Sequence, residues 1–223
     1  MSKIKRKTIF KQELLLIKAL KEKGLYPKDL TIRCDHDLGL NYVNDVKLGI
    51  KYPDSFFHKA VSLTTKNRNT DFYFNGYINE TGGRDELLEP FQKFTNSIII
   101  SSDEGRNQAK KDIFNKNYFS QLSNAKFGLC PHQIDWPGSK KHMWTYRFIE
   151  SCFVGAIPVL FMSTPLGDNF INGYYYVWDK DFIEGYTCAI NKYSHRKATA
   201  NQVLARKQFC LTDIEVAMIV STL

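Results

Sequence analysis

Hydrophobic and polar positions follow two different periods along the chain, and the change of period predicts the elements. Apolar residues recur every three or four positions over residues 9–23, so we expect a helix there, ended by Gly24 and Pro27. A short apolar run predicts a strand at residues 30–34. From that strand to Asn69 the pattern is weak and predicts no further element.

After residue 69, short apolar runs alternate with amphipathic stretches. The runs expected to form strands are residues 71–75, 97–101, 126–130, 157–161 and 174–178. The stretches expected to form helices are residues 84–94, 118–125, 142–154, 201–209 and 213–221. This alternation is typical of βαβ units, so the chain is predicted to be an α/β protein with a Rossmann-like, doubly wound parallel sheet. We expect a small N-terminal lobe at residues 1–69 and a sheet domain at residues 70–223.

The composition is that of a soluble globular protein, with 43% hydrophobic and 24% charged residues. The formal net charge is +8, and part of the excess lies near the start of the chain. The basic residues there are Lys3, Lys5, Arg6, Lys7, Lys11, Lys18, Lys21 and Lys23. Two interpretations stay open: a solvated face, or electrostatic attachment to an anionic membrane or acceptor.

Cysteine usage and hydropathy suggest where the protein works. The five cysteines form no CxxC pair and are odd in number, which argues against a disulfide framework or a zinc site. No stretch approaches the ~20 apolar residues of a membrane-spanning helix. The basic start lacks the apolar region of a signal peptide. We therefore expect a cytoplasmic protein, with peripheral membrane contact through the basic start as an option.

Candidate ligand-binding residues follow the first predicted strand. In open α/β sheets the ligand lies beyond the carboxyl ends of the strands. Gly76 ends that strand, and Gly82-Gly83 lead into a helix that begins at Arg84. Glycine lets a ligand approach the backbone, while a helix N-terminus and an arginine both favour phosphate. A Gly-Gly turn is also a plain connection, so this segment alone is weak evidence.

A second group of candidates follows the third predicted strand. It comprises Pro131, His132, Lys141, Tyr146, Arg147 and Glu150. Apolar residues 148, 149, 152 and 153 mark the buried side of the helix, so Tyr146, Arg147 and Glu150 are expected on the opposite side. The cations suit a diphosphate, and the carboxylate can accept hydrogen bonds from ribose hydroxyls. The alternative is a surface pair of Arg147 and Glu150, which would stabilise the helix only slightly.

A family resemblance bears on this choice. From Arg147 to Val159 the chain reads R-x-x-E-x-x-x-x-G-x-I-P-V, after a strand that ends in L-C-P at Pro131. This pattern resembles the signature of exostosin-type glycosyltransferases, and residues 71–76 with Arg84 resemble the family's opening strand and its arginine. The resemblance covers roughly residues 70–165. It implies a GT-B architecture in which Glu150 binds the donor ribose and Arg84 and Arg147 bind the diphosphate.

The function that this resemblance implies is transfer of a sugar from a nucleotide diphosphate, with UDP as the expected carrier, to a hydroxyl of a glycan or glycoconjugate. Inversion at the anomeric carbon without a required cofactor is expected, because cations and a helix dipole can stabilise the leaving diphosphate. Fewer than 70 residues stand where GT-B enzymes carry an acceptor domain. A nucleic-acid-binding module is a third hypothesis, ranked last because no element interleaves basic and aromatic residues.

The segment Asp35-His36-Asp37 is the candidate for the general base, with Asp37 or Asp35 favoured over His36 because a carboxylate tolerates the positive charge that develops on the sugar. An inverting transfer needs a group that removes the acceptor's proton, and that group normally comes from the acceptor side. The segment is also a DxD, the manganese- or magnesium-binding signature of the other glycosyltransferase architecture. With 14 aspartates, about one DxD is expected by chance, and Asp179-Lys180-Asp181 is a second. Capping of a turn is the third interpretation of Asp35-His36-Asp37.

Overall fold

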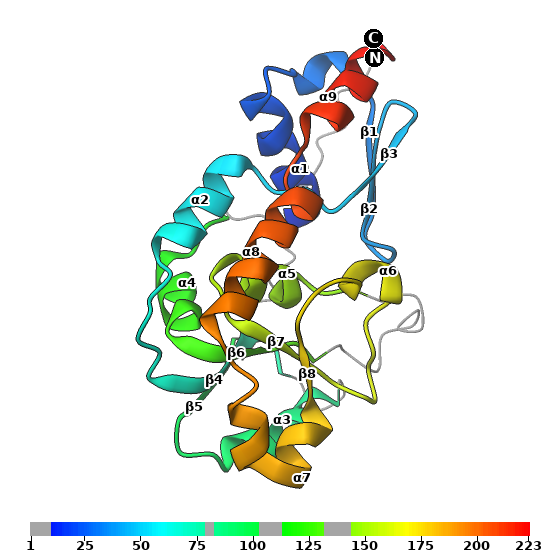
Figure 1. The fold of residues 1–223 in the computed structure, drawn as a ribbon. Helices are drawn as coiled ribbons and strands as arrows, with labels where there is room; N and C mark the ends of the chain where they lie inside the picture. Colours follow the sequence, from blue (N-terminus) through cyan, green and yellow to red (C-terminus); the bar gives the residue numbers. More distant parts are fainter. Residues whose placement is uncertain (1–9, 79–82, 103–112, 132–143) are drawn as a thin grey trace.

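The structure, a computed structural model, describes residues 10–78, 83–102, 113–131 and 144–223. Its centre is a five-stranded parallel sheet in the order β5-β4-β6-β7-β8 (Figure 1). The strands are β4 (Thr70–Gly76), β5 (Ser97–Ser101), β6 (Ala125–Leu129), β7 (Ile157–Leu160) and β8 (Val177–Trp178). The predicted α/β class with a parallel sheet is confirmed, and the sheet is compatible with a Rossmann-like fold.

The strand order shows where the winding of the sheet reverses. Numbered along the chain, the five strands lie in the order 2-1-3-4-5, so the reversal falls between β4 and β6. Helices α3 (Arg84–Gln92) and α7 (Asp179–Ile190) cover one face of the sheet. Helices α4 (Lys116–Ser123), α5 (Tyr146–Phe153) and α8 (His195–Phe209) cover the other. The sheet is therefore wound on both sides.

Burial on both faces explains why the strands read as nearly continuous apolar runs. Along β4, Phe72 and Phe74 point to the α3 side, while Tyr73 points to the α4 side, and all three are buried. Strand β5 has the expected bounds but not the expected full burial. It lies at the edge of the sheet, and Ile98, Ile99 and Ile100 are only half-buried because a single strand pairs with it.

The N-terminal lobe begins with α1 (Lys11–Glu22), where a helix was expected, and a 3-10 turn (η1, Pro27–Asp29). An antiparallel three-stranded sheet follows: β1 (Ile32–Asp35), β2 (Leu40–Val43) and β3 (Val46–Gly49). Helix α2 (Asp54–Ser62) then packs on α5. The weak pattern after residue 34 predicted none of β2, β3 and α2. Strands of four residues such as β2 and β3 offer only two positions per face and so leave little periodic signal.

The C-terminal end of the chain returns to the N-terminal lobe. Helix α9 (Asp213–Val220) packs beside β3 (Figure 1). Leu211 and Ile219 are buried in one cluster with Leu16, Leu20 and Val43. Their burial against α1 and the small sheet joins the two ends of the chain in a single core.

Several boundaries differ from the prediction. Helix α8 begins at His195, six residues early, because the Ser194 side chain caps it. Helix α6 (Asp168–Ile171) and α7 were not expected, and the strand predicted at residues 174–178 keeps only two residues. Within the four described ranges, no helix is long and apolar enough to cross a membrane.

Candidate functional site

The winding reversal lies between β4 and β6, so the carboxyl ends of these two strands are the place where a ligand is expected. Gly76 ends β4, and buried Pro131 lies two residues beyond β6. Helix α5 follows in the chain and begins near the same edge. Two further candidates, His132 and Lys141, lie outside the described residues.

Arg147 crosses the end of β4. Its guanidinium carbon lies 4.6 Å from the centre of the Phe74 ring. A Cβ atom added to Gly76 would lie 1.7 Å from Nη2 of Arg147. The Thr145 side chain caps α5 by accepting the backbone N–H of Arg147 at 3.4 Å. The glycine thus makes room for a protein side chain, and the helix start fixes where that side chain leaves the backbone.

Arg84 is the second cation of this edge. It is the first residue of α3, which Gly83 enters in the left-handed conformation, with a φ of 60°. Nη1 of Arg84 donates a hydrogen bond to the Tyr77 carbonyl at 2.9 Å. Among the residues that the structure describes, its buried Nε atom has no hydrogen-bond partner.

The two guanidinium groups repel each other. Burial, and then the positive charge of Arg147, lower the pKa of Arg84 to about 9. Arg84 therefore stays a cation at neutral pH, and arginine side chains in general keep their charge. Two like charges at the carboxyl end of one strand favour an anion between or beside them.

Glu150 lies on a buried side of α5, although it was expected on the exposed side, and only 1% of it is accessible. Its carboxylate accepts hydrogen bonds from Lys11 Nζ at 2.6 Å, Tyr118 Oη at 2.9 Å and Tyr52 Oη at 3.4 Å. The physical reason is that α5 packs on the sheet on one side and is covered by the N-terminal lobe on another. Glu150 and Lys11 thereby form a buried ion pair between the lobe and α5.

Sequence reasoning missed Lys11, Tyr52 and Tyr118 as partners of Glu150. Lys11 was grouped with the solvated or membrane-facing basic residues, yet it is buried. A lysine just inside a predicted helix gives no sign of pairing with a residue 139 positions away. Tyr52 lay in the segment without predicted elements, and burial and the charge of Glu150 raise its pKa.

Tyr146, the first residue of α5, is half-buried between two groups. Lys11 Nζ lies 4.4 Å from the centre of its ring, and the Trp144 ring lies 4.8 Å away on another side. Burial first, and then the charge of Glu150, raise the pKa of the Tyr146 hydroxyl. Tyr146 is therefore neutral at physiological pH and can donate a hydrogen bond.

The turn between β1 and β2 carries Asp35-His36-Asp37 to the start of α5. Trp144 Nε1 donates a hydrogen bond to the His36 carbonyl at 3.2 Å. A Cβ atom on Gly39 would lie 2.8 Å from atoms of the Trp144 ring, so the turn packs closely on that ring. The structure thus brings this candidate of the lobe next to the helix that carries Arg147.

The three residues of the turn differ in their surroundings. Oδ1 of Asp35 accepts the N–H groups of Asp37 at 3.1 Å and Leu38 at 3.0 Å, which is the turn-capping interpretation. Asp37 is exposed. The His36 ring is half-buried against Phe10, 4.3 Å away between ring centres. Burial lowers the pKa of His36, outweighing the nearby carboxylates of Glu13, Asp35 and Asp37.

Neither DxD segment belongs to a cluster of potential metal ligands among the described residues. Within the described ranges, no three His, Cys, Asp or Glu side chains are grouped so that they could hold a metal ion. In the second DxD, Oδ1 of Asp179 accepts the Met162 N–H at 3.1 Å, and Asp181 accepts the Trp178 N–H at 3.3 Å. These two aspartates cap the start of α7 and the end of β7.

Comparison with known proteins adds no assignment. No family model matches the chain, and no curated protein matches it significantly.

Proposed function

We propose that this chain is a GT-B glycosyltransferase that binds a nucleotide diphosphate sugar at the carboxyl ends of β4 and β6 and transfers the sugar to a hydroxyl of a glycan or glycoconjugate. The observation that carries the proposal is the pair Arg84 and Arg147 at the end of β4. It lies where the winding of the sheet reverses, the usual ligand position in such sheets.

A diphosphate fits this pair better than a single charge does. Each guanidinium offers a planar fork of N–H groups that matches two phosphate oxygens. Arg84 also begins α3, so the positive end of that helix adds to its charge. These groups would stabilise the charge that develops on the departing nucleotide diphosphate. They supply that role without a metal ion, and activity that survives a chelator would separate this mechanism from the DxD alternative.

The acceptor would approach from the lobe, at the β1–β2 turn. The attacking hydroxyl must lose its proton as it bonds to the anomeric carbon, and the nucleotide diphosphate leaves with the electron pair of the broken bond. Asp35 already holds the turn through two backbone N–H groups. His36, with its lowered pKa, is the turn's most suitable proton acceptor, and Asp37 is the alternative.

The test compares UDP with uridine on wild type, Arg84→Gln and Arg147→Gln. The proposal expects each substitution to weaken UDP binding by about 10-fold or more, the effect of one charge-assisted hydrogen bond, and to leave uridine binding unchanged. Arg196→Gln, at an exposed position of α8, is the control with the same change of charge. Equal losses for UDP and uridine would mean that the arginines only support the fold.

A further inference from the structure

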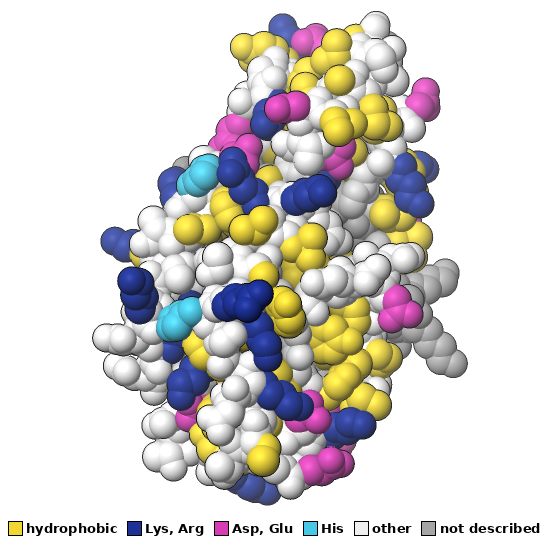
Figure 2. Space-filling view, viewed as in Figure 1, with side chains coloured by type: hydrophobic (Ala, Val, Ile, Leu, Met, Phe, Trp, Pro, Cys, Tyr) yellow, Lys and Arg dark blue, Asp and Glu magenta, His cyan; other side chains and the backbone are white. Residues whose placement is uncertain are grey.

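A second ligand site is suggested by a cavity of about 530 Å³ between α2, α8 and the segment that leads into α9. It shares no residue with the candidate site at the end of β4. Figure 2 shows lysine and arginine side chains around hydrophobic ones on the face over α2 and α8. The lining comprises Lys23, Asp54, Phe57, Val61, Val203, Arg206, Lys207, Leu211 and Asp213, with Thr199, Gln202, Cys210 and Thr212.

The interior of the cavity is apolar. Phe57, Cys210 and Leu211 are buried beneath it, and Val61 and Val203 form its walls. Val203 is 67% exposed, so its side chain is accessible to a ligand in the cavity. The volume lies within the ~300–1,000 Å³ range of small-molecule pockets, which are mostly apolar with a few polar groups.

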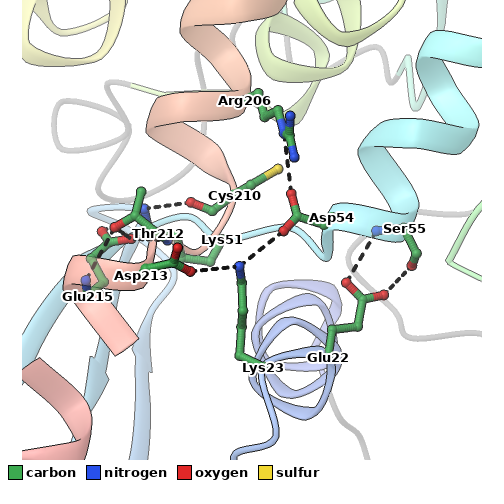
Figure 3. Close-up of polar contacts among 10 residues, drawn as sticks. All are labelled: Glu22, Lys23, Lys51, Asp54, Ser55, Arg206, Cys210, Thr212, Asp213 and Glu215. Carbon is green, nitrogen blue, oxygen red and sulfur yellow. Dashed lines mark hydrogen bonds and ion pairs between the residues drawn. The ribbon is translucent and has the colours of Figure 1, made fainter. Parts of the chain in front are cut away.

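The rim carries more positive than negative charge. Lys23, Arg206 and Lys207 supply three cations, and Asp54 and Asp213 supply two carboxylates. Figure 3 shows Asp54 between two of the cations, with Oδ2 at 3.4 Å from Lys23 Nζ and Oδ1 at 3.5 Å from Arg206 Nε. One carboxylate is therefore shared by two cations, and both contacts are long.

The remaining carboxylate screens the rim only weakly. Asp213 pairs with Lys23 at 3.2 Å, but its side chain is 97% exposed to water. Burial would lower the pKa of Lys23, but its pairs with Asp213 and Asp54 outweigh burial and raise it, so Lys23 stays charged. Lys207 extends the positive rim along α8. The guanidinium of Arg206 lies 5.7 Å above the Phe57 ring, where the charged rim meets the apolar floor.

We propose that this cavity, the α2–α8 pocket, binds a small amphiphilic anion: a phosphate or carboxylate group joined to an apolar chain. The anionic group would bind at Lys23, Arg206 and Lys207, and the chain would lie on Phe57, Val61 and Val203. Because Lys23 directly follows α1 and Arg206 belongs to α8, the bound molecule would contact both of these helical segments.

The experiment uses octyl phosphate below its micelle-forming concentration, with calorimetry and backbone amide NMR on the full chain. Wild type should bind it, with shifts at residues of α2 and α8. Inorganic phosphate should bind at least 10-fold more weakly, because it lacks the apolar chain. Octyl glucoside should also bind at least 10-fold more weakly, because it lacks the charge. Failure of octyl phosphate to bind at millimolar concentration would overturn the proposal.

Variants locate the binding. Arg206→Gln should weaken octyl phosphate by about 10-fold, whereas Arg196→Gln, the same change earlier on the same helix, should have no effect. Val203→Asp places a carboxylate on the exposed wall and should abolish binding, whereas Ile183→Asp, at an exposed position of α7, should not. Equal affinities in Arg206→Gln and Arg196→Gln would show attraction to the overall positive charge and would overturn the proposal.

Binding to phospholipid vesicles distinguishes the two possible sources of the anion, a lipid head group and a free metabolite. Binding of monomeric octyl phosphate together with vesicles of an anionic phospholipid, both lost in Val203→Asp, would identify a lipid head group. Binding of the monomer without the vesicles would identify a free metabolite. Binding of vesicles by wild type and by Val203→Asp alike, without binding of the monomer, would overturn the proposal.

Discussion

A single glycine illustrates how residues at the end of β4 depend on one another. We expect Gly76→Ala to displace the Arg147 guanidinium, because the new Cβ would lie 1.7 Å from Nη2. If Arg147 binds the diphosphate, UDP affinity measured by calorimetry should fall by about 10-fold or more. Stability should change little, because the end of a flexible side chain moves. Gly49→Ala is the control, since nothing lies within 4 Å of the Cβ it would add.

Asp71 makes a residue-scale prediction about pH. It is buried at the start of β4 and accepts hydrogen bonds from Tyr186 at 2.7 Å, Lys126 at 2.8 Å and Asn96 at 3.2 Å. Burial alone would raise its pKa, but these partners outweigh burial and lower it. The folded-state pKa thus lies below the unfolded value of about 3.9. Its contribution to stability is complete above that value and is lost as the pH falls through the folded-state pKa.

The measurement is the free energy of unfolding in urea between about pH 7 and 3 for wild type and Asp71→Asn. We expect wild type to keep its advantage over the variant down to about pH 4 and to lose it progressively below that pH. If the two curves stay parallel, the hydrogen bonds of Asp71 do not depend on its charge.

At the scale of elements, periodicity predicted where the strands of the sheet lie but predicted the wrong exposure for Glu150 of α5. The predicted strand at 97–101 matches β5 residue for residue, because β-branched runs between polar segments leave few alternatives. A period of 3.6 identifies one buried side of a helix. Helix α5 has two, against the sheet and under the lobe, so polar Glu150 was interpreted as exposed. Lys11 and Tyr52, its partners, come from segments whose approach to α5 only the tertiary fold determines.

The Lys11–Glu150 pair should hold α1 against α5. Lys11→Met leaves a buried carboxylate without its cation and should lower the free energy of unfolding by about 3–5 kcal/mol. Combined with Glu150→Gln, the loss should be smaller than the sum of the two single losses, because neither charge is then left alone. Additive losses in urea unfolding would show that the two side chains do not interact.

The single variant Glu150→Gln tests whether Glu150 also binds the donor ribose. That role requires the carboxylate to exchange a protein hydrogen bond for a ribose hydroxyl. Folded Glu150→Gln should then bind UDP more weakly by about 1.5–3 kcal/mol, the range for hydrogen bonds to charged groups. Unchanged UDP affinity together with lost stability would make Glu150 a purely structural link between α5 and the lobe.

At the scale of the whole molecule, α9 joins the ends of the chain. The division at residue 69 stays a prediction, and the core of the lobe includes Ile219 from the far end of the chain. Ile219→Ala should therefore cost about 2–5 kcal/mol and shift a single unfolding transition. Ile214→Ala on the same helix should cost less than about 0.5 kcal/mol, because Ile214 is 76% exposed. Two separate transitions, with only one shifted by Ile219→Ala, would show independent units.

The meeting of lobe and sheet also determines where transfer could occur. The β1–β2 turn touches Trp144, two residues before α5, so a proton acceptor on the turn would lie on the acceptor side of Arg147. Sequence reasoning favoured Asp37 or Asp35 over His36, because a carboxylate tolerates the positive charge developing on the sugar. In the structure Asp35 caps the turn, whereas the lowered pKa of His36 leaves its imidazole unprotonated at neutral pH.

We therefore expect His36→Ala to lower the transfer rate by about 10²–10⁴-fold while UDP affinity stays within about twofold, because a base acts on the acceptor and not on the nucleotide. Asp37→Asn should have the smaller effect, and Asp35→Asn should act through stability. Since the base must be unprotonated, the wild-type kcat/KM should rise with pH through the lowered pKa of His36, with the midpoint of the rise below the usual histidine value of about 6.5. Rates within about fivefold of wild type in all three variants would remove the turn from the chemistry.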